Sequence, residues 1–385
     1  MRSLKIVQFF LIMSLFACQA PVRPVDQPAY FKDPKEALAH IAKSLGRQIT
    51  FVGSPSIKSV PVDEFFNESS AEVAVSGKVF QQQLTTMLGQ EAKDINFSVL
   101  SKKNIATAQW IVLSSYSPIK DKVAEQPGSW IRLKTVVADV VTGKQLAASE
   151  SYLQSSQFQG DPTKFFKESP MFLTDKRHKD RIEVMNGKAQ PLKEKLTVQA
   201  SFADAVALYD EGKFVEAEEG FREVLKLTPE HQGALSGIYQ SLWQQGKKIP
   251  AESAFGKFLA VGFDEGNISI KILFKVNGTD FVDAGDLPLQ YKLWTKSIGQ
   301  TMVAKSKCLD VTGHASKSGS SEYNDRLSLQ RATKVVATIQ NFSPVTAGKL
   351  KANGKGFQET IVGTGSNDAT DAIDRRVEFI VKTCN

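Results

Sequence analysis

Cysteines and histidines are the residues of this chain that could bind a transition metal or act as nucleophile and base. The sequence contains three cysteines and four histidines, spread over its whole length. They are Cys18, Cys308, Cys384, His40, His178, His231 and His314. No pair has the His-x-x-x-His or Cys-x-x-Cys spacing that is typical of metal sites. We therefore expect neither a metal nor a cofactor.

Sequence motifs of covalent and phosphate-binding enzymes are missing as well. The chain has no Gly-x-Ser-x-Gly elbow, in which a strained turn exposes a nucleophilic serine. Gly143-Lys144 lacks the preceding glycine of a phosphate-binding loop. We predict that the protein is not an enzyme and that its function is to bind other molecules.

Length and composition indicate a protein of several globular domains. The 385 residues are 42% hydrophobic and 23% charged, which excludes collagen-like, wholly disordered and disulfide-dense classes. A chain of this length predicts two or three domains, each with a core of its own. No apolar stretch reaches the ~18 residues of a membrane span, so a protein with several spans is excluded.

The first residues have the pattern of an export signal. Arg2 and Lys5 precede a mostly apolar run over residues 6–16, as in secretory signals. The run closes on Leu15-Phe16-Ala17-Cys18, which resembles the lipobox of bacterial lipoproteins. The resemblance implies a signal peptide over residues 1–17 and a diacylated, palmitate-type anchor on Cys18. An ordinary signal peptide with an incidental cysteine is the alternative.

The residues after Cys18 suggest where such an anchor would lie. In lipoproteins of this kind an aspartate after the cysteine favours the inner membrane, so Gln19 points to the outer membrane. The resemblance thus implies a chain anchored by lipid in the outer membrane and facing the periplasm. Residues 18–29 contain three prolines and are interpreted as a tether.

Charge divides the rest of the chain into three parts. Residues 18–200 contain 24 basic and 19 acidic residues, residues 201–264 contain 6 and 10, and residues 265–385 contain 16 and 12. The middle part is therefore acidic, between two basic flanks. Because no basic stripe with interleaved aromatic residues occurs, we expect solvated surfaces and no nucleic-acid partner. The polar residues 186–200 are interpreted as a linker.

The acidic middle, residues 201–264, contains an internal repeat. Four residues recur after 34 positions, which is the tetratricopeptide period. The pairs are Gly212 and Gly246, Ala217 and Ala251, Phe221 and Phe255, and Leu225 and Leu259. Two repeats are fewer than an independent solenoid needs, so we expect this helical block to lean on a neighbouring domain. It would serve either as a groove for a partner protein or as a helical spacer.

The C-terminal part, residues 265–385, contains the most specific motifs. Alternating apolar residues predict a strand over 268–276, followed by a helix around Trp294 and a second strand over 308–312. The motifs that follow are Gly313-His314-Ala315-Ser316, Tyr323–Ala332, Gly354–Glu359 and Asp374-Arg375-Arg376. This order resembles the OmpA-like peptidoglycan-binding domain over about 120 residues. The resemblance implies a small α/β domain that grips the diaminopimelate of the peptidoglycan stem peptide.

The family's binding residues transfer to this chain with one departure. Arg331 corresponds to the arginine that pairs the ligand carboxylate, and Asn324 to the loop asparagine. Asp374 and Arg375 fall at the family's paired-arginine turn. Ser316 stands where the family has an aspartate that pairs the ligand ammonium. A hydroxyl carries no charge, so we expect binding to be weaker by ~1.5–3 kcal/mol, which is one to two decades.

The two remaining cysteines both lie in this C-terminal part. Cys308 opens one predicted strand and Cys384 follows the last one. If these strands pair antiparallel, the start of one meets the end of the other. An oxidising periplasm permits a bond, so we predict a Cys308–Cys384 disulfide, provided that the Cα atoms lie within ~7 Å.

The N-terminal part, residues 30–185, is predicted to be an α/β domain. Helical segments begin near Pro34 and around residues 79–88, and strands are expected over 97–100, 110–116 and 130–141. The last of these ends in Asp139-Val140-Val141-Thr142-Gly143-Lys144. The pattern resembles the fold of the CsgG, LpoB and FlgO envelope lipoproteins, and a generic α/β domain is the alternative.

These features predict a three-part protein, α/β and then helical and then α/β, with two functional hypotheses. The first is a non-catalytic outer-membrane lipoprotein that binds peptidoglycan through its OmpA-like domain. It would scaffold an envelope assembly such as a secretion or flagellar machine, with envelope proteins as partners of its first two parts. The alternative is a regulator that docks on a peptidoglycan synthase and has a degenerate wall-binding site.

Overall fold

The architecture is seen in a computed structural model of the whole chain, which describes residues 27–52, 59–119, 128–172, 174–268, 270–360 and 374–384. It is mixed α/β, with 11 α-helices and two sheets in the described part. The predicted signal peptide, Cys18 and most of the predicted tether lie outside these residues. No helix in the described ranges is long and apolar enough to cross a membrane.

The N-terminal part is built on a six-stranded mixed sheet in the order β1-β6-β5-β4-β2-β3. Its strands are β1 (Ala29–Phe31), β2 (Ser59–Asn67), β3 (Asn96–Val99), β4 (Trp110–Pro118), β5 (Trp130–Asp139) and β6 (Gln145–Gln154). Strands β2, β3 and β4 run parallel to one another, whereas β4, β5 and β6 form an antiparallel meander. The short helix α3 (Lys102–Ile105) lies between β3 and β4, and the short helix η1 (Ser155–Gln157) follows β6.

Helices cover both faces of this sheet, because its strands are apolar on both sides. Val112 of β4 faces helices α1 (Pro34–Val52) and α2 (Val75–Glu91). Its neighbours Ile111 and Leu113 point to the other face, where they join the core of α4 (Lys164–Glu168) and α5 (Lys176–Met185).

Four helices form the middle of the chain, and they come in two pairs. They are α6 (Lys193–Asp210), α7 (Phe214–Leu227), α8 (Gln232–Gln244) and α9 (Lys248–Asp264). Gly212 and Gly246 turn the chain within each pair at φ values of 80° and 75°, which favour glycine. Helix α6 begins inside the segment predicted to be a linker, because Leu192, Leu196 and Ala200 recur at helical spacing and are buried.

The C-terminal part has a four-stranded sheet in the order β7-β10-β8-β9. The strands are β7 (Asn267–Ile268), β8 (Lys307–Gly313), β9 (Leu350–Gly354) and β10 (Val377–Thr383). The helices that accompany it are α10 (Leu287–Ala304), α11 (Ser321–Phe342) and the short η2 (Pro344–Thr346). Strand β10 runs antiparallel to β7 and β8, and β8 runs parallel to β9.

One predicted strand is mostly absent. The alternation over 268–276 predicted a strand, yet only β7, which ends at Ile268, belongs to the sheet. Further along, Ile270 forms an isolated bridge to Met171, and Phe274 forms one to Phe281. The chain leaves the sheet because the Lys271 amide donates to the Pro170 carbonyl of the N-terminal part, at 2.7 Å. Ile270, Ile272 and Phe274 are nevertheless buried.

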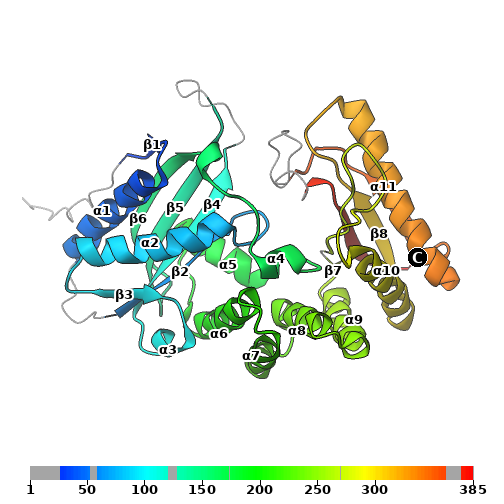
Figure 1. Cartoon of the computed structure of the whole chain (residues 1–385), viewed down its shortest axis with the longest axis horizontal. Helices are drawn as coiled ribbons and strands as arrows, with labels where there is room; N and C mark the ends of the chain where they lie inside the picture. The colour runs from blue at the N-terminus through cyan, green and yellow to red at the C-terminus, as the bar shows by residue number, and fades with distance from the viewer. Residues whose placement is uncertain are drawn as a thin grey trace, which may run out of the picture.

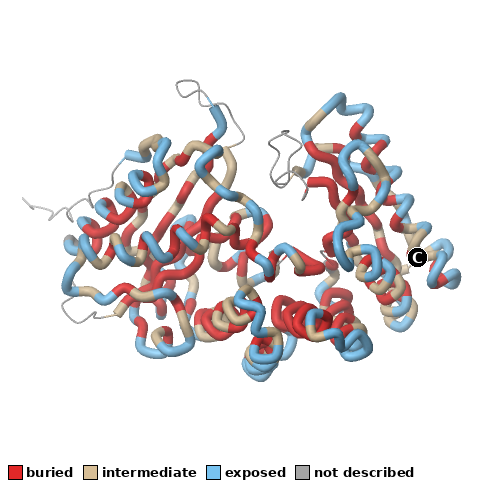
Figure 2. The backbone as a smooth tube through the Cα atoms, in the orientation of Figure 1, coloured by how far each residue is buried: buried red, intermediate tan, exposed pale blue. Residues whose placement is uncertain are grey.

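The three parts share one continuous apolar core. Figure 1 shows helices α6–α9 as a row that joins the two α/β parts, and Figure 2 shows buried backbone running through all three. Phe165 packs on Phe202 and Phe221 at the first junction, with ring centroids 5.6 and 5.5 Å apart. At the second junction Trp294 of α10 stacks on Phe255 of α9.

Candidate functional site

Arg331 lies on α11 and its side chain is almost wholly enclosed, with 1% of the residue exposed. Helix α11 approaches the end of β8 so closely that a Cβ on Gly313 would lie 2.0 Å from the Ser328 carbonyl oxygen. Gly313 therefore permits the contact that places Arg331 beneath the loop after β8. Leu327 and Val335, each four residues from Arg331, are also buried, so this face of the helix lies inward.

Backbone carbonyls accept three hydrogen bonds from the guanidinium of Arg331. Nε donates to Gly278 O at 3.0 Å, Nη1 to His314 O at 3.2 Å and Nη2 to Lys275 O at 3.2 Å. The guanidinium carbon also lies 5.3 Å from the ring centroid of Phe274. Two of these carbonyls belong to one segment, which covers Arg331.

The charge of Arg331 has no acidic partner within the described ranges. Burial, followed by the nearby positive charge of Arg375, lowers the pKa of Arg331 to about 10. Carbonyl dipoles satisfy the N–H groups but supply no countercharge. A carboxylate that reached this guanidinium could accept two parallel hydrogen bonds from it, and the guanidinium is charged and partly desolvated.

The segment over Arg331 is fixed by contacts of its own. The Phe274 amide donates to Arg375 O at 3.3 Å and Arg375 Nε donates to Phe274 O at 3.4 Å. Lys275 pairs with Asp283 at 2.7 Å, and the Lys275 amide donates to Asp280 O. Arg331 and Arg375 are thus brought together on the same short stretch of backbone.

Ser316 and Asn324 lie at the loop that follows β8. Ser316 is 5% exposed, and its Oγ is 3.5 Å from Ser318 Oγ. Asn324 Nδ2 donates to Ser318 O at 2.7 Å and to Ser320 O at 3.0 Å. Asn324 therefore shapes the loop in which Ser316 lies. The same loop begins beside His314, whose carbonyl accepts a hydrogen bond from Arg331.

The turn before β10 is also buried. Asp374 is fully buried and Arg375 is 6% exposed. Arg376 pairs with Glu378 at 2.6 Å and donates to Glu359 O at 3.2 Å. Although burial opposes it, the nearby His314 ring, whose Nε2 lies 3.6 Å from Glu378 Oε2, and the charge of Arg376 lower the pKa of Glu378 to about 2.

The sequence did not single out Glu378 or the carbonyls of Lys275 and Gly278 as parts of the site. Glu378 lies on β10, two residues after Arg376, which directly precedes the strand, so a spacing of two is the signal that could have paired them. No sequence signal identifies a backbone carbonyl as the partner of Arg331. No cluster of three or more metal-ligating side chains occurs in the part of the chain that the structure describes.

Cys308 and Cys384 are joined by a disulfide at the far end of the same sheet, with Cα atoms 5.0 Å apart. Antiparallel pairing of β8 with β10 places Lys307 opposite Thr383 and Cys308 opposite Lys382. The start of β8 and the end of β10 therefore meet, and this geometry allows the bond.

Comparison with known proteins identifies one part of the chain. Residues 286–373 match the model of the OmpA family. No curated protein matches the chain. The matched range includes Arg331, Asn324 and Ser316.

Several solved structures are similar to about a third of the chain. The peptidoglycan-associated lipoprotein from Burkholderia pseudomallei is 21% identical, with a TM-score of 0.26, and the match covers 29% of this chain and 89% of that one. The cell wall anchor of the T6SS from Pseudomonas aeruginosa is 24% identical, with a TM-score of 0.25 and coverages of 33% and 95%. The periplasmic domain of Helicobacter pylori MotB is 17% identical, with a TM-score of 0.24 and coverages of 30% and 72%.

The assignment rests on the family model, whose matched range contains α10, β8, α11 and β9. The chain therefore carries a C-terminal OmpA family domain.

Proposed function

We propose that this protein is a non-catalytic lipoprotein of the outer membrane that binds peptidoglycan through its OmpA family domain and scaffolds an envelope assembly. The observation that carries the proposal is Arg331, a buried guanidinium inside the family match that has no acidic partner among the described residues. The missing partner would be a carboxylate of diaminopimelate in the stem peptide. Asn324 would hold the loop that lines the site, with Asp374 and Arg375 beside it.

Retention on purified sacculi tests this proposal. We expect the wild-type chain to cosediment with sacculi and Arg331→Ala to lose that retention. Arg326→Ala is the matched control, because Arg326 is an arginine on the same helix whose side chain is exposed. No retention of the wild type, or equal retention of Arg331→Ala, would remove the claim of wall binding.

Ser316 offers a gain-of-function test. Ser316→Asp restores the negative charge that the family places at this position, next to the ligand ammonium. We expect affinity for diaminopimelate to rise by one to two decades, because a hydrogen bond to a charged group contributes ~1.5–3 kcal/mol. Ser318→Asp, two residues away in the same loop, is the control, and an equal gain there would indicate a nonspecific charge effect.

Lipid anchoring is tested separately. Incorporation of labelled palmitate into the wild type, with none in Cys18→Ser, would support an acylated Cys18. We expect the acylated chain to fractionate with the outer membrane, as Gln19 suggests. Crosslinking in intact envelopes would then identify partners of the N-terminal part and of helices α6–α9.

One observation favours a second candidate, a regulator docking on a peptidoglycan synthase with a degenerate wall site. Arg331, Asn324 and Ser316 are all at least nine-tenths buried in this conformation. A chain that crosslinks to a synthase and does not cosediment with sacculi would favour this candidate over the scaffold.

A further inference from the structure

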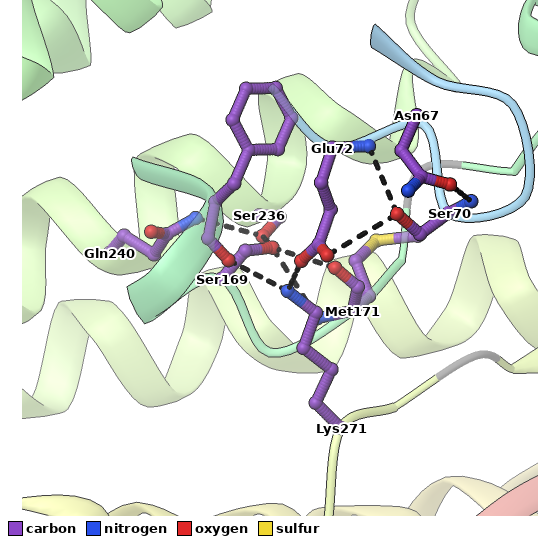
Figure 3. A network of polar contacts seen from close by, with 9 residues as sticks. Asn67, Ser70, Glu72, Ser169, Met171, Ser236, Gln240 and Lys271 are labelled. Atoms are coloured by element: carbon purple, nitrogen blue, oxygen red, sulfur yellow. Dashed lines mark hydrogen bonds and ion pairs between the residues drawn. The ribbon is translucent and has the colours of Figure 1, made fainter. Parts of the chain in front are cut away.

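A buried ion pair joins the N-terminal and C-terminal parts. Lys271 Nζ pairs with Glu72 of the β2–α2 connection, and the two side chains are 7% and 8% exposed. Nζ also donates to Phe166 O at 2.7 Å and lies 4.7 Å from the Phe172 ring. Figure 3 shows Lys271 reaching from its own segment to the Glu72 carboxylate. We call this contact the clasp.

Further polar contacts lie beside the clasp. Ser70 Oγ donates to Glu72 Oε2 at 3.3 Å, and the Asn67 side chain accepts the Ser70 amide at 3.1 Å. Behind them, Ser169 contacts Ser236 of α8 at 3.3 Å (Figure 3). The clasp is therefore embedded at the point where all three parts of the chain meet.

The segment that bears Lys271 is the one that covers Arg331. We call residues 271–283 the strap. Three residues after Lys271, Phe274 O accepts Arg375, and then Lys275 O and Gly278 O accept Arg331. Phe281 closes the strap against Phe274, with ring centroids 5.3 Å apart. The first residue of the strap thus belongs to the junction and its middle belongs to the candidate site.

We propose that the strap is a gate over Arg331 and that the Glu72–Lys271 clasp holds it closed. This inference rests on the proposed function, since the ligand is taken to be a carboxylate of the peptidoglycan stem peptide. For that carboxylate to reach a guanidinium that is 1% exposed, the carbonyls of Lys275 and Gly278 must move away. The movement breaks two hydrogen bonds to Arg331 and replaces them with an ion pair.

The clasp then couples the docking of the N-terminal part to ligand binding. If the ligand binds only when the strap is open, a contact that stabilises the closed strap weakens ligand binding by the same free energy. Thermodynamic linkage makes this effect reciprocal, so ligand binding weakens the contact to the same extent. Ligand binding should therefore loosen the N-terminal part, and a partner that pulls on the N-terminal part should raise wall affinity.

The test uses the full chain with the double substitution Glu72→Gln and Lys271→Met, which removes both charges together so that neither is left buried and unpaired. The probe is meso-diaminopimelate, titrated by calorimetry. We expect the double variant to bind about tenfold more tightly than the wild type, a coupling of ordinary size. Adding Arg331→Met should abolish binding in both backgrounds.

A matched control removes a different ion pair between two parts. Lys296 of α10 pairs with Glu252 of α9 at 2.8 Å, and neither residue belongs to the strap. Glu252→Gln with Lys296→Met should leave affinity unchanged. An equal gain in this control would overturn the specific role of the clasp.

Hydrogen exchange supplies a readout that needs no ligand. The amides of Phe274, Lys275 and Val282 donate to backbone carbonyls within or beside the strap. We expect them to exchange faster in the clasp variant and at unchanged rates in the control. Unchanged exchange and unchanged affinity would overturn the gate while leaving wall binding intact. Faster exchange with no binding by wild type or variant would support the moving strap and refute the proposed function.

Discussion

Lys271 and Arg331 are both buried cations, yet only Lys271 has a carboxylate partner among the described residues. Lys271 pairs with Glu72 across the junction, whereas Arg331 donates to three backbone carbonyls. A buried charge without a countercharge is costly, because its hydration is lost and no Coulomb attraction replaces it. The difference indicates that Lys271 completes a structural contact and that Arg331 lacks a partner that a ligand could supply.

The largest expected loss of stability comes from breaking the Glu72–Lys271 ion pair. Glu72→Gln leaves Lys271 buried opposite a neutral amide, so we expect the free energy of unfolding to fall by ~3–5 kcal/mol. Urea unfolding followed by circular dichroism measures this. Adding Lys271→Met should recover most of the loss, because the orphaned charge is removed as well. A loss below about 1 kcal/mol for the single variant would show that the junction tolerates the charge.

His178 shows a third response of a basic group to burial, which is to remain neutral. Its Nε2 lies 2.9 Å from Glu68 O, and burial, followed by the charge of Arg181, lowers its pKa to about 4. The unfolded chain takes up the proton near pH 6.5, so stability should fall as pH drops from about 6.5 to 4 and level off below. The full change is on the order of 3 kcal/mol.

Comparison with His178→Gln isolates this effect from other titrating groups, including His231, whose pKa burial also lowers. We expect the difference in unfolding free energy between wild type and variant to shrink across the same pH range. A difference that stays constant from pH 7 to pH 4 would mean that His178 has the same pKa in the folded and the unfolded chain.

Removing Arg331, which has no acidic partner among the described residues, should lower the free energy of unfolding less than leaving Lys271 without Glu72. Arg331→Met loses three hydrogen bonds but also relieves the cost of a buried charge, so we expect a loss below about 2 kcal/mol. Thermal and urea unfolding check this. A loss as large as that of Glu72→Gln would instead make Arg331 a structural cation, and the contrast with Lys271 would disappear.

The smallest effect is expected at the surface of the strap. Lys275 and Asp283 pair at 2.7 Å, but both side chains are largely exposed and solvent screens their attraction. We expect Asp283→Asn to leave the melting temperature unchanged within error at low and high salt. A salt-dependent drop would assign this pair a part in closing the strap.

Most secondary structure followed from local pattern. The predicted segments around Pro34, over 79–88, over 110–116 and over 308–312 correspond to α1, α2, β4 and β8. In α2, Phe80, Leu84 and Leu88 are buried as the spacing predicts, whereas Val79 is exposed at 44%. Local periodicity sets these elements because each buries one face against its nearest neighbours.

Long-range contacts could not be predicted in this way. Lys271 stands between Ile270 and Ile272, so alternation assigns it to the solvent face of a strand. It is buried because its side chain pairs with Glu72, which lies 199 residues earlier in the sequence. Likewise the resemblance identified Arg331, but its carbonyl partners depend on how the strap folds back, which no side-chain pattern records.

The Cys308–Cys384 disulfide has a mechanical consequence. The two cysteines are 76 residues apart in sequence, and β8, α11, β9 and β10 lie almost wholly between them. A load applied between α10 and the C-terminus would pass across the sulfur bridge. About 260 Å of chain therefore stays out of the path of force. Under tension the fold around Arg331 therefore keeps a covalent boundary.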